Sequence, residues 1–244
     1  MSPETLLALA LVAVYVADSA HFLAIGEALI RTRSGRTAGL SFGWPFELAG
    51  RRPFIPNPLT PFWPELRLVW TPSSAGGAGP AEAVSAEMRA HLAAVRPVAW
   101  IASVCAALIA VVAPLALAFG REPLFVAATL LCLALSAAAC ALTASRRKEL
   151  RLTGLPLFST ILVALVCLPC AGNLARSVAA QRRWSVAAAE LPALGFEGTP
   201  AAPLRAQLQE ALGAARRVLP EDSAAHSALS EQLRRLEGEA REPD

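Results

Sequence analysis

The chain has 244 residues, of which 55% are hydrophobic and 17% are charged, and its formal net charge is +3. Soluble domains contain about 45 to 50% apolar and about 25% charged residues, so this composition favours a membrane protein. Lys and Arg are spread over the loops and the carboxyl-terminal tail instead of forming one basic face, which argues against nucleic-acid binding.

The first apolar run, residues 6–30, is long enough to cross a bilayer, which takes about 20 mostly apolar residues. The residues before it carry no positive charge, and the run is longer than a signal-peptide core, so we expect the helix to be retained. On a helix, Tyr15, Asp18 and His21 follow one another at i, i+3 and i+6 and form a polar stripe on one side.

Ionisable groups within a span suggest a proton relay, an ion or metal site, or a buried active site. The alternative is a polar contact that fixes how the first helix packs against its neighbours. We favour the packing contact, because the other apolar runs contain no second cluster of carboxylates or histidines.

The next segment, residues 31–80, is rich in aromatic residues and proline, and it ends in a flexible linker over residues 71–80. Apolar and polar residues alternate over residues 40–48 and again from Leu66 to Trp70, which predicts strands. We expect the segment to lie at the level of the lipid headgroups; a docking site for a partner protein and a substrate-binding lip are alternatives. The residues assigned to this interface are Trp44, Phe46, Arg51, Arg52, Phe62, Trp63 and Trp70.

Residues 81–174 are predicted to form a short helix, ended by Pro97, and three further spans. The expected fold is an all-α membrane protein with four transmembrane helices in a bundle. Pro169 is expected to kink the last span. The predicted spans after the first are residues 98–119, 124–143 and 155–174, and the predicted domains are residues 1–30, 31–80, 81–174 and 175–244.

Lys and Arg are concentrated in the connections 31–96 and 145–154. The positive-inside rule therefore places these connections inside and both termini outside. In a double-membrane bacterium the chain is then a multi-pass protein of the inner membrane with periplasmic termini.

The carboxyl-terminal region, residues 175–244, is predicted to be soluble and largely helical. One amphipathic stripe runs from Leu204 to Leu219 and a second from Leu229 to Leu236, and Ser223 is placed to cap the second helix. A hairpin of this size has too little area to be stable alone. We expect it to pack on the membrane domain, on a second copy or on a partner protein.

All five cysteines lie in the predicted spans, which argues against an extracellular disulfide framework. Cys167 and Cys170 form a C-x-x-C motif, which can support disulfide exchange. In outline, a four-helix membrane bundle with such a pair resembles the quinone-linked thiol oxidases. Those enzymes also need a second cysteine pair, and the other cysteines here are single in the sequence. We therefore favour packing as the role of these cysteines, with redox chemistry, or metal binding together with His21, as alternatives.

The sequence contains no G-x-S-x-G, H-E-x-x-H or phosphate-binding glycine loop, and we expect neither a cofactor nor a metal site. The favoured function is a non-enzymatic scaffold or accessory subunit that binds envelope proteins; whether the chain is an enzyme stays open. The first alternative is a small transporter or channel component that uses Asp18 and His21. The second is a membrane thiol-disulfide oxidoreductase that uses Cys167 and Cys170.

Overall fold

The computed structural model describes residues 3–24, 26–33, 36–44, 46–71, 81–187, 194 and 201–239. The chain folds into two compact units, each assembled from three separate stretches of sequence. Unit 1 comprises Met1–His21, Ile55–Glu65 and Ala90–Arg182. Unit 2 comprises Phe22–Phe54, Leu66–Arg89 and Arg183–Asp244.

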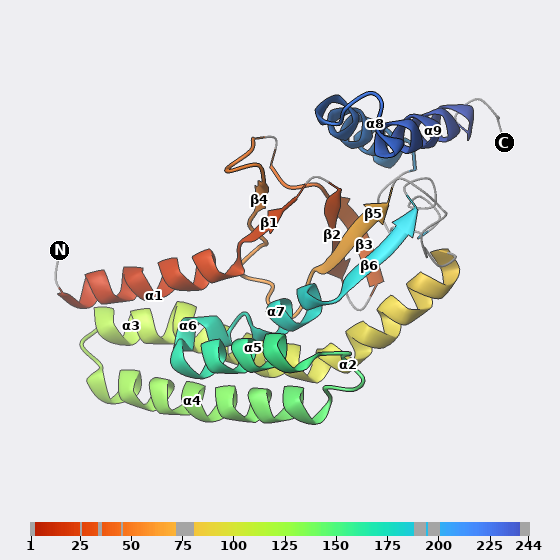
Figure 1. Cartoon of the computed structure of the whole chain (residues 1–244). Coiled ribbons are helices and arrows are strands. Elements are labelled where there is room, and N and C mark those ends of the chain that lie inside the picture. Colours follow the sequence, from red (N-terminus) through yellow and green to blue (C-terminus); the bar gives the residue numbers. More distant parts are fainter. Residues whose placement is uncertain are drawn as a thin grey trace. The chain divides into compact units, whose positions relative to one another are not determined.

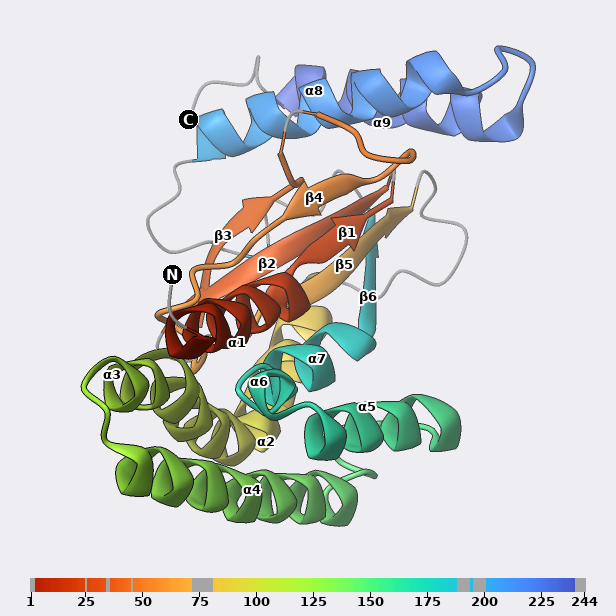
Figure 2. The same ribbon diagram turned by 90° about the vertical axis from the view of Figure 1, so that its left-hand side faces the viewer.

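Unit 1 is built from helices. Within it, α1 packs against α3 and α6, and α4 packs against α3 and α5 (Figures 1 and 2). The helix α2 begins in unit 2 and enters unit 1 at Ala90. The helical elements are α1 (Pro3–Ser19), α2 (Ala81–Ala107), the π-helical η2 (Leu108–Val112), α3 (Ala113–Ala118), α4 (Glu122–Ser145), α5 (Gly154–Val166), α6 (Leu168–Ala171) and α7 (Leu174–Gln181).

Two helical runs in the described part of the chain, Glu82–Ala118 and Glu122–Ser145, are long and apolar enough to cross a membrane. Their length and composition suggest membrane association. The expected four-helix, all-α membrane bundle is wrong, because only these two runs within the described ranges qualify and because the chain also forms two β-sheets. The predicted first span, residues 6–30, is not one helix, since α1 ends at Ser19 and strands follow it.

Pro97 does not end its helix as the sequence predicts, whereas Pro169 does interrupt the predicted fourth span. The helix predicted to stop before Pro97 continues to Ala107. An internal proline costs a helix about 3 kcal/mol, and burial of the adjacent Val95, Val98 and Ala99 offsets that cost. Pro169 interrupts the predicted fourth span: α5 ends at Val166, Cys167 is extended, and the proline sits in the first turn of α6, where its missing amide hydrogen is tolerated.

Unit 2 contains most of the sheet structure. A four-stranded sheet has the order β3-β2-β5-β6 (Figure 1), in which β2 is antiparallel to both of its neighbours and β6 is parallel to β5. A two-stranded sheet pairs β1 with β4. The strands are β1 (His21–Leu23), β2 (Glu27–Arg33), β3 (Arg36–Ser41), β4 (Arg52–Phe54), β5 (Leu66–Thr71) and β6 (Arg183–Ala187).

The sheet residues show which strand predictions hold. The strand expected from Leu66 to Trp70 is confirmed as β5. The alternation over residues 40–48 gives a strand only as far as Ser41, where β3 ends. The apolar residues Ala28, Leu29 and Ile30, assigned from the sequence to the first span, are instead fully buried in β2.

The carboxyl-terminal part of unit 2 forms the two helices that the amphipathic pattern indicates, α8 (Ala201–Val218) and α9 (Ala224–Glu239). The two helices pack against each other. Their stripes of Leu208, Leu212, Leu229 and Leu236 are buried. Ser223 caps α9, because its Oγ accepts a hydrogen bond from the His226 amide at 3.1 Å.

Candidate functional site

A buried arginine on α7 organises the polar interior of unit 1. The Arg176 side chain is 1% exposed, and its Nε lies 3.4 Å from the Glu65 carboxylate. Its Nη2 donates to the carbonyls of Asn57 at 2.6 Å and Thr60 at 3.1 Å. A buried charge is tolerated when it is paired and hydrogen-bonded. Arg176 therefore holds the proline-rich stretch of unit 1 against α7.

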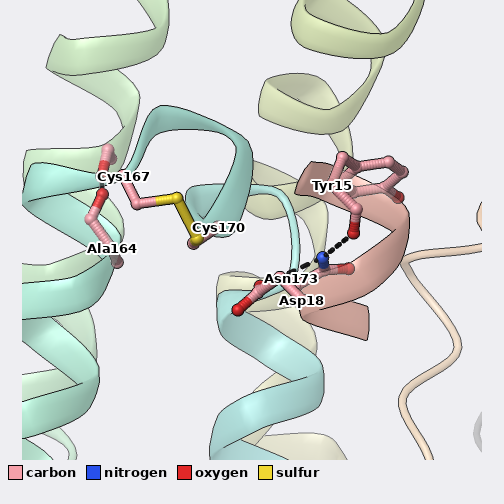
Figure 3. The surroundings of a disulfide bond; sticks show 7 residues. Tyr15, Asp18, Ala164, Cys167, Cys170 and Asn173 are labelled. Carbon is pink, nitrogen blue, oxygen red and sulfur yellow. Dashed lines mark hydrogen bonds between the residues drawn. A yellow bond between two sulfur atoms is a disulfide. The ribbon is translucent and has the colours of Figure 1, made fainter. Parts of the chain in front are cut away.

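Asn173, just before α7, connects this interior to α1. Its Nδ2 donates to the backbone carbonyl of Tyr15 at 2.7 Å and to the Asp18 carboxylate at 3.2 Å (Figure 3). Its Oδ1 accepts from Arg176 at 3.4 Å. Burial raises the pKa of the Asp18 carboxyl above its ordinary value of 3.8, and the hydrogen bond from Asn173 opposes this rise. One amide thus joins α1, α7 and the arginine network.

The three residues of the predicted polar stripe have different partners. The Tyr15 hydroxyl donates to the Pro58 carbonyl at 2.7 Å, whereas Asp18 accepts from Asn173. His21 lies beyond the end of α1, in β1, and its Nε2 is 4.0 Å from the Glu65 carboxylate. The stripe is therefore not one continuous helical face, and each of its members ties α1 or the residues after it to another segment of unit 1.

The disulfide between Cys167 and Cys170 lies at the break between α5 and α6. Cys167 is partly exposed, whereas Cys170 is 9% exposed. Figure 3 shows the disulfide with Ala164 of α5 on one side and the hydrogen-bonded pair of Asp18 and Asn173 on the other. The two cysteines therefore differ in their exposure to solvent.

A pocket of about 140 Å³ connects the disulfide to the carboxylate on α1. Cys170 and Asp18 both line it, and three hydroxyl side chains supply further polar atoms. The pocket is therefore lined both by a carboxyl group and by a cysteine of the disulfide. Its lining residues are Asp18, Ser159, Thr160, Val163, Ala164, Cys170, Leu174 and Ser177.

The residues predicted to form an interfacial layer fall in both units. In unit 2, the Trp44 and Phe46 side chains are 40% and 53% exposed, and their ring centroids are 5.5 Å apart. Arg51 is exposed, and the Arg52 guanidinium lies 3.5 Å from the Glu47 carboxylate.

The other members of the predicted layer have different surroundings. In unit 1, the Phe62 ring lies 4.7 Å from that of Trp63 and stacks on Trp100 at 6.3 Å. Trp70 is on β5, and its side chain lies outside the described residues. The aromatic residues of this segment are therefore divided between the two units.

Sequence reasoning missed the roles of Arg176, Asn173 and Glu65. The sequence around Arg176, from Leu174 to Ala179, is mostly apolar, a pattern that indicates a buried charge. Among the described residues, no group of three or more His, Cys, Asp or Glu side chains is placed to hold a metal ion.

No protein-family model, curated protein or solved structure matches the chain.

Proposed function

We propose that the chain is a membrane-associated thiol-disulfide oxidoreductase whose disulfide between Cys167 and Cys170 exchanges with the dithiol of a protein or small molecule. One observation carries the proposal: Cys167 is partly exposed, while Cys170 is buried and shares a pocket with the Asp18 carboxyl. Exchange needs an accessible sulfur for attack and a way to protonate the leaving thiolate. The pair and its pocket supply both.

The reaction follows from this asymmetry. A substrate thiolate attacks the Cys167 sulfur, the bond to Cys170 breaks, and Cys170 leaves as a thiolate. The second substrate thiolate then attacks the sulfur bound to Cys167 and releases Cys167. The substrate dithiol becomes a disulfide, and its two protons end on Cys167 and Cys170. Asp18 has the role of a proton carrier in the pocket, helped by the burial that raises its pKa.

We place the protein in the inner membrane of a double-membrane bacterium, which it crosses with the runs Glu82–Ala118 and Glu122–Ser145. The sequence-based orientation assumes four crossings, whereas α1 and α5 have only 17 and 13 residues. Two crossings also leave both termini on one side of the membrane. The side that carries the disulfide is measurable: a membrane-impermeant thiol reagent applied to reduced, intact cells labels Cys167 only if it faces outward.

The central test uses the full chain in detergent micelles. Cys170→Ser leaves the partly exposed Cys167 as a thiol, and this variant should form a mixed disulfide with oxidised glutathione. Cys167→Ser leaves the buried Cys170 and should not form one. Cys140→Ser, which removes a buried thiol outside the motif and keeps the disulfide, should form no mixed disulfide, like the unaltered chain. Intact-mass spectrometry reads all three outcomes.

Two results would overturn the proposal. One is a failure of the Cys170→Ser chain to react with glutathione. The other is a pair of cysteines that stays in one redox state across buffers of oxidised and reduced dithiothreitol.

An accessory subunit is the second candidate, favoured by an exposed apolar tip in unit 2. Trp44, Phe46 and Leu48 are 40%, 53% and 58% exposed. A photo-crosslinking residue at Phe46 should capture one reproducible envelope protein, and the same residue at the exposed Arg234 on α9 should not. Equal capture at both positions would remove this candidate.

Transport coupled to Asp18 and His21 receives less support. The two side chains have separate partners, Asn173 for Asp18 and Glu65 for His21, so a shared ion site at this pair would require rearrangement. A pH-dependent flux in proteoliposomes that Asp18→Asn abolishes would revive it.

A further inference from the structure

Two of the remaining cysteines form a pair in space. Cys105 on α2 and Cys132 on α4 are free thiols, 0% and 1% exposed. The Cys105 Sγ donates to the backbone carbonyl oxygen of Cys132 at 3.9 Å, although the two residues are 27 apart in sequence. The two cysteines are single in the sequence, but the packing of the helices brings them together.

The pair packs against the segment that carries the disulfide. Cys105 and Cys132 share one hydrophobic cluster with Ala171, and Leu168 packs against that cluster. Leu168 and Ala171 directly follow Cys167 and Cys170 in the chain. The segment that carries the disulfide therefore packs against the cluster that contains Cys105 and Cys132.

Gly172 shows how close the two backbones are. A Cβ at Gly172 would lie 3.1 Å from both the Cα and the Cβ of Ala106, the residue after Cys105. Only a residue without a side chain fits this approach without displacing its neighbours. The stretch from Cys170 to Gly172 thus runs against the stretch of α2 that carries Cys105.

We propose that Cys105 and Cys132 are a second, interior dithiol that exchanges with the disulfide between Cys167 and Cys170. This inference rests on the proposed function, because it requires that disulfide to be redox-active. It adds a partner for the disulfide inside the same chain.

The exchange balances without an external reagent. One of the two interior cysteines, as a thiolate, attacks the Cys170 sulfur, the existing disulfide breaks, and Cys167 leaves as a thiolate. The other interior cysteine then attacks the sulfur of the first in the mixed disulfide and releases Cys170. Two electrons pass from the interior pair to Cys167 and Cys170, and the protons of Cys105 and Cys132 end on the two released thiolates.

The test traps the mixed disulfide. In a Cys167→Ser chain, Cys170 has lost its partner, and mild oxidation with copper phenanthroline should link it to Cys105 or Cys132 within one chain. Proteolysis and mass spectrometry identify the linked peptides. Cys140 is the internal control, because its Sγ donates to the Ile161 carbonyl on α5 at 3.9 Å. Replacing it by Ala should leave the link intact.

A chain with Cys167→Ser, Cys105→Ala and Cys132→Ala should form no such link, and its circular dichroism and gel-filtration profile report whether it folds. A link from Cys170 to Cys140, a link only between chains, or a Cys170 that stays fully alkylatable in the folded Cys167→Ser chain would overturn the inference.

A second measurement separates this inference from the proposed function. Alkylation of the unaltered chain across dithiothreitol redox buffers should show four titrating cysteines. If only Cys167 and Cys170 change state, the interior dithiol is refuted and the proposed function stands. If no cysteine changes state, both are refuted.

Discussion

The Nε of Arg176 lies 3.4 Å from the carboxylate of Glu65, and the two side chains are 1% and 7% exposed. The same guanidinium donates to the carbonyls of Asn57 and Thr60. One side chain therefore pairs with the Glu65 carboxylate and with two backbone carbonyls of the stretch that precedes it. Removing one member of such a buried pair leaves the charge of the other without its main counter-charge. The pair is therefore expected to govern the stability of unit 1.

Arg176→Met should lower the free energy of unfolding by about 3 to 5 kcal/mol, because Glu65 loses its guanidinium and the two carbonyls lose their donor. Chemical denaturation in detergent micelles measures the change. Arg183→Met is the matched control: the Arg183 side chain is 66% exposed and lies 3.9 Å from Glu27. Its cost should stay below about 1 kcal/mol. Similar losses in the two variants would contradict the network.

Asp18→Asn should change how stability depends on pH. Burial raises the pKa of the Asp18 carboxyl above 3.8, so above that pH the folded chain holds a proton that the unfolded chain has released. The stabilisation from this group is full below the unfolded pKa and is lost as pH rises through the folded pKa. Asn keeps an oxygen that accepts from Asn173 and carries no charge.

Melting temperatures measured from about pH 4 to pH 8 should therefore fall less in Asp18→Asn than in the unaltered chain. The proposed proton transfer also predicts that the rate of glutathione exchange loses part of its pH dependence in the variant. An unchanged stability profile would mean that solvent screens this carboxyl.

Gly172→Ala should destabilise unit 1 by about 1 to 3 kcal/mol through overpacking. The new Cβ would lie 3.0 Å from the Tyr15 Cε2 and 3.1 Å from two atoms of Ala106. Gly213→Ala in α8 is the control, because no heavy atom lies within 4 Å of its added Cβ. That change should stabilise the helix by about 0.5 to 1 kcal/mol. Thermal unfolding should thus shift in opposite directions in the two variants.

Ser223→Ala should weaken the start of α9 by about 1 kcal/mol, because the His226 amide loses the oxygen that accepts its hydrogen bond at 3.1 Å. Hydrogen exchange in the first turn of α9 measures the effect. Ser227→Ala, an exposed position in the same helix, should leave this exchange nearly unchanged. Equal acceleration in both variants would show that the cap does not hold the helix end.

The sequence predicts well those helices whose length and ends are set by neighbouring residues. Leucines three or four residues apart and the break at Pro220 define α8 and α9, and an apolar run bounded by charge defines α4. The prediction of one helix over residues 6–30 was wrong because an apolar run does not distinguish a helix from a buried strand. The strand β2 exists because β3 and β5 pair with it on both sides, and those partners come from other parts of the chain.

The candidate site divides in the same way. The C-x-x-C motif is visible in the sequence, but the pocket that joins Cys170 to Asp18 depends on Asn173 docking against α1. Pairing of Cys105 with Cys132 likewise depends on the packing of α2 against α4. Contacts between residues distant in sequence decide both features, and neither spacing nor composition contains that information.

The parallel pairing of β5 with β6 also sets an order of events during synthesis. Roughly 110 residues separate Thr71 from Arg183, and they include both helical runs able to cross a membrane. A ribosome that adds about 5 to 20 residues per second takes on the order of 5 to 20 seconds to make them. During that interval one edge of β5 waits without β6 and can pair with another chain. The sheet therefore closes only on a nascent chain whose helical insert is already complete.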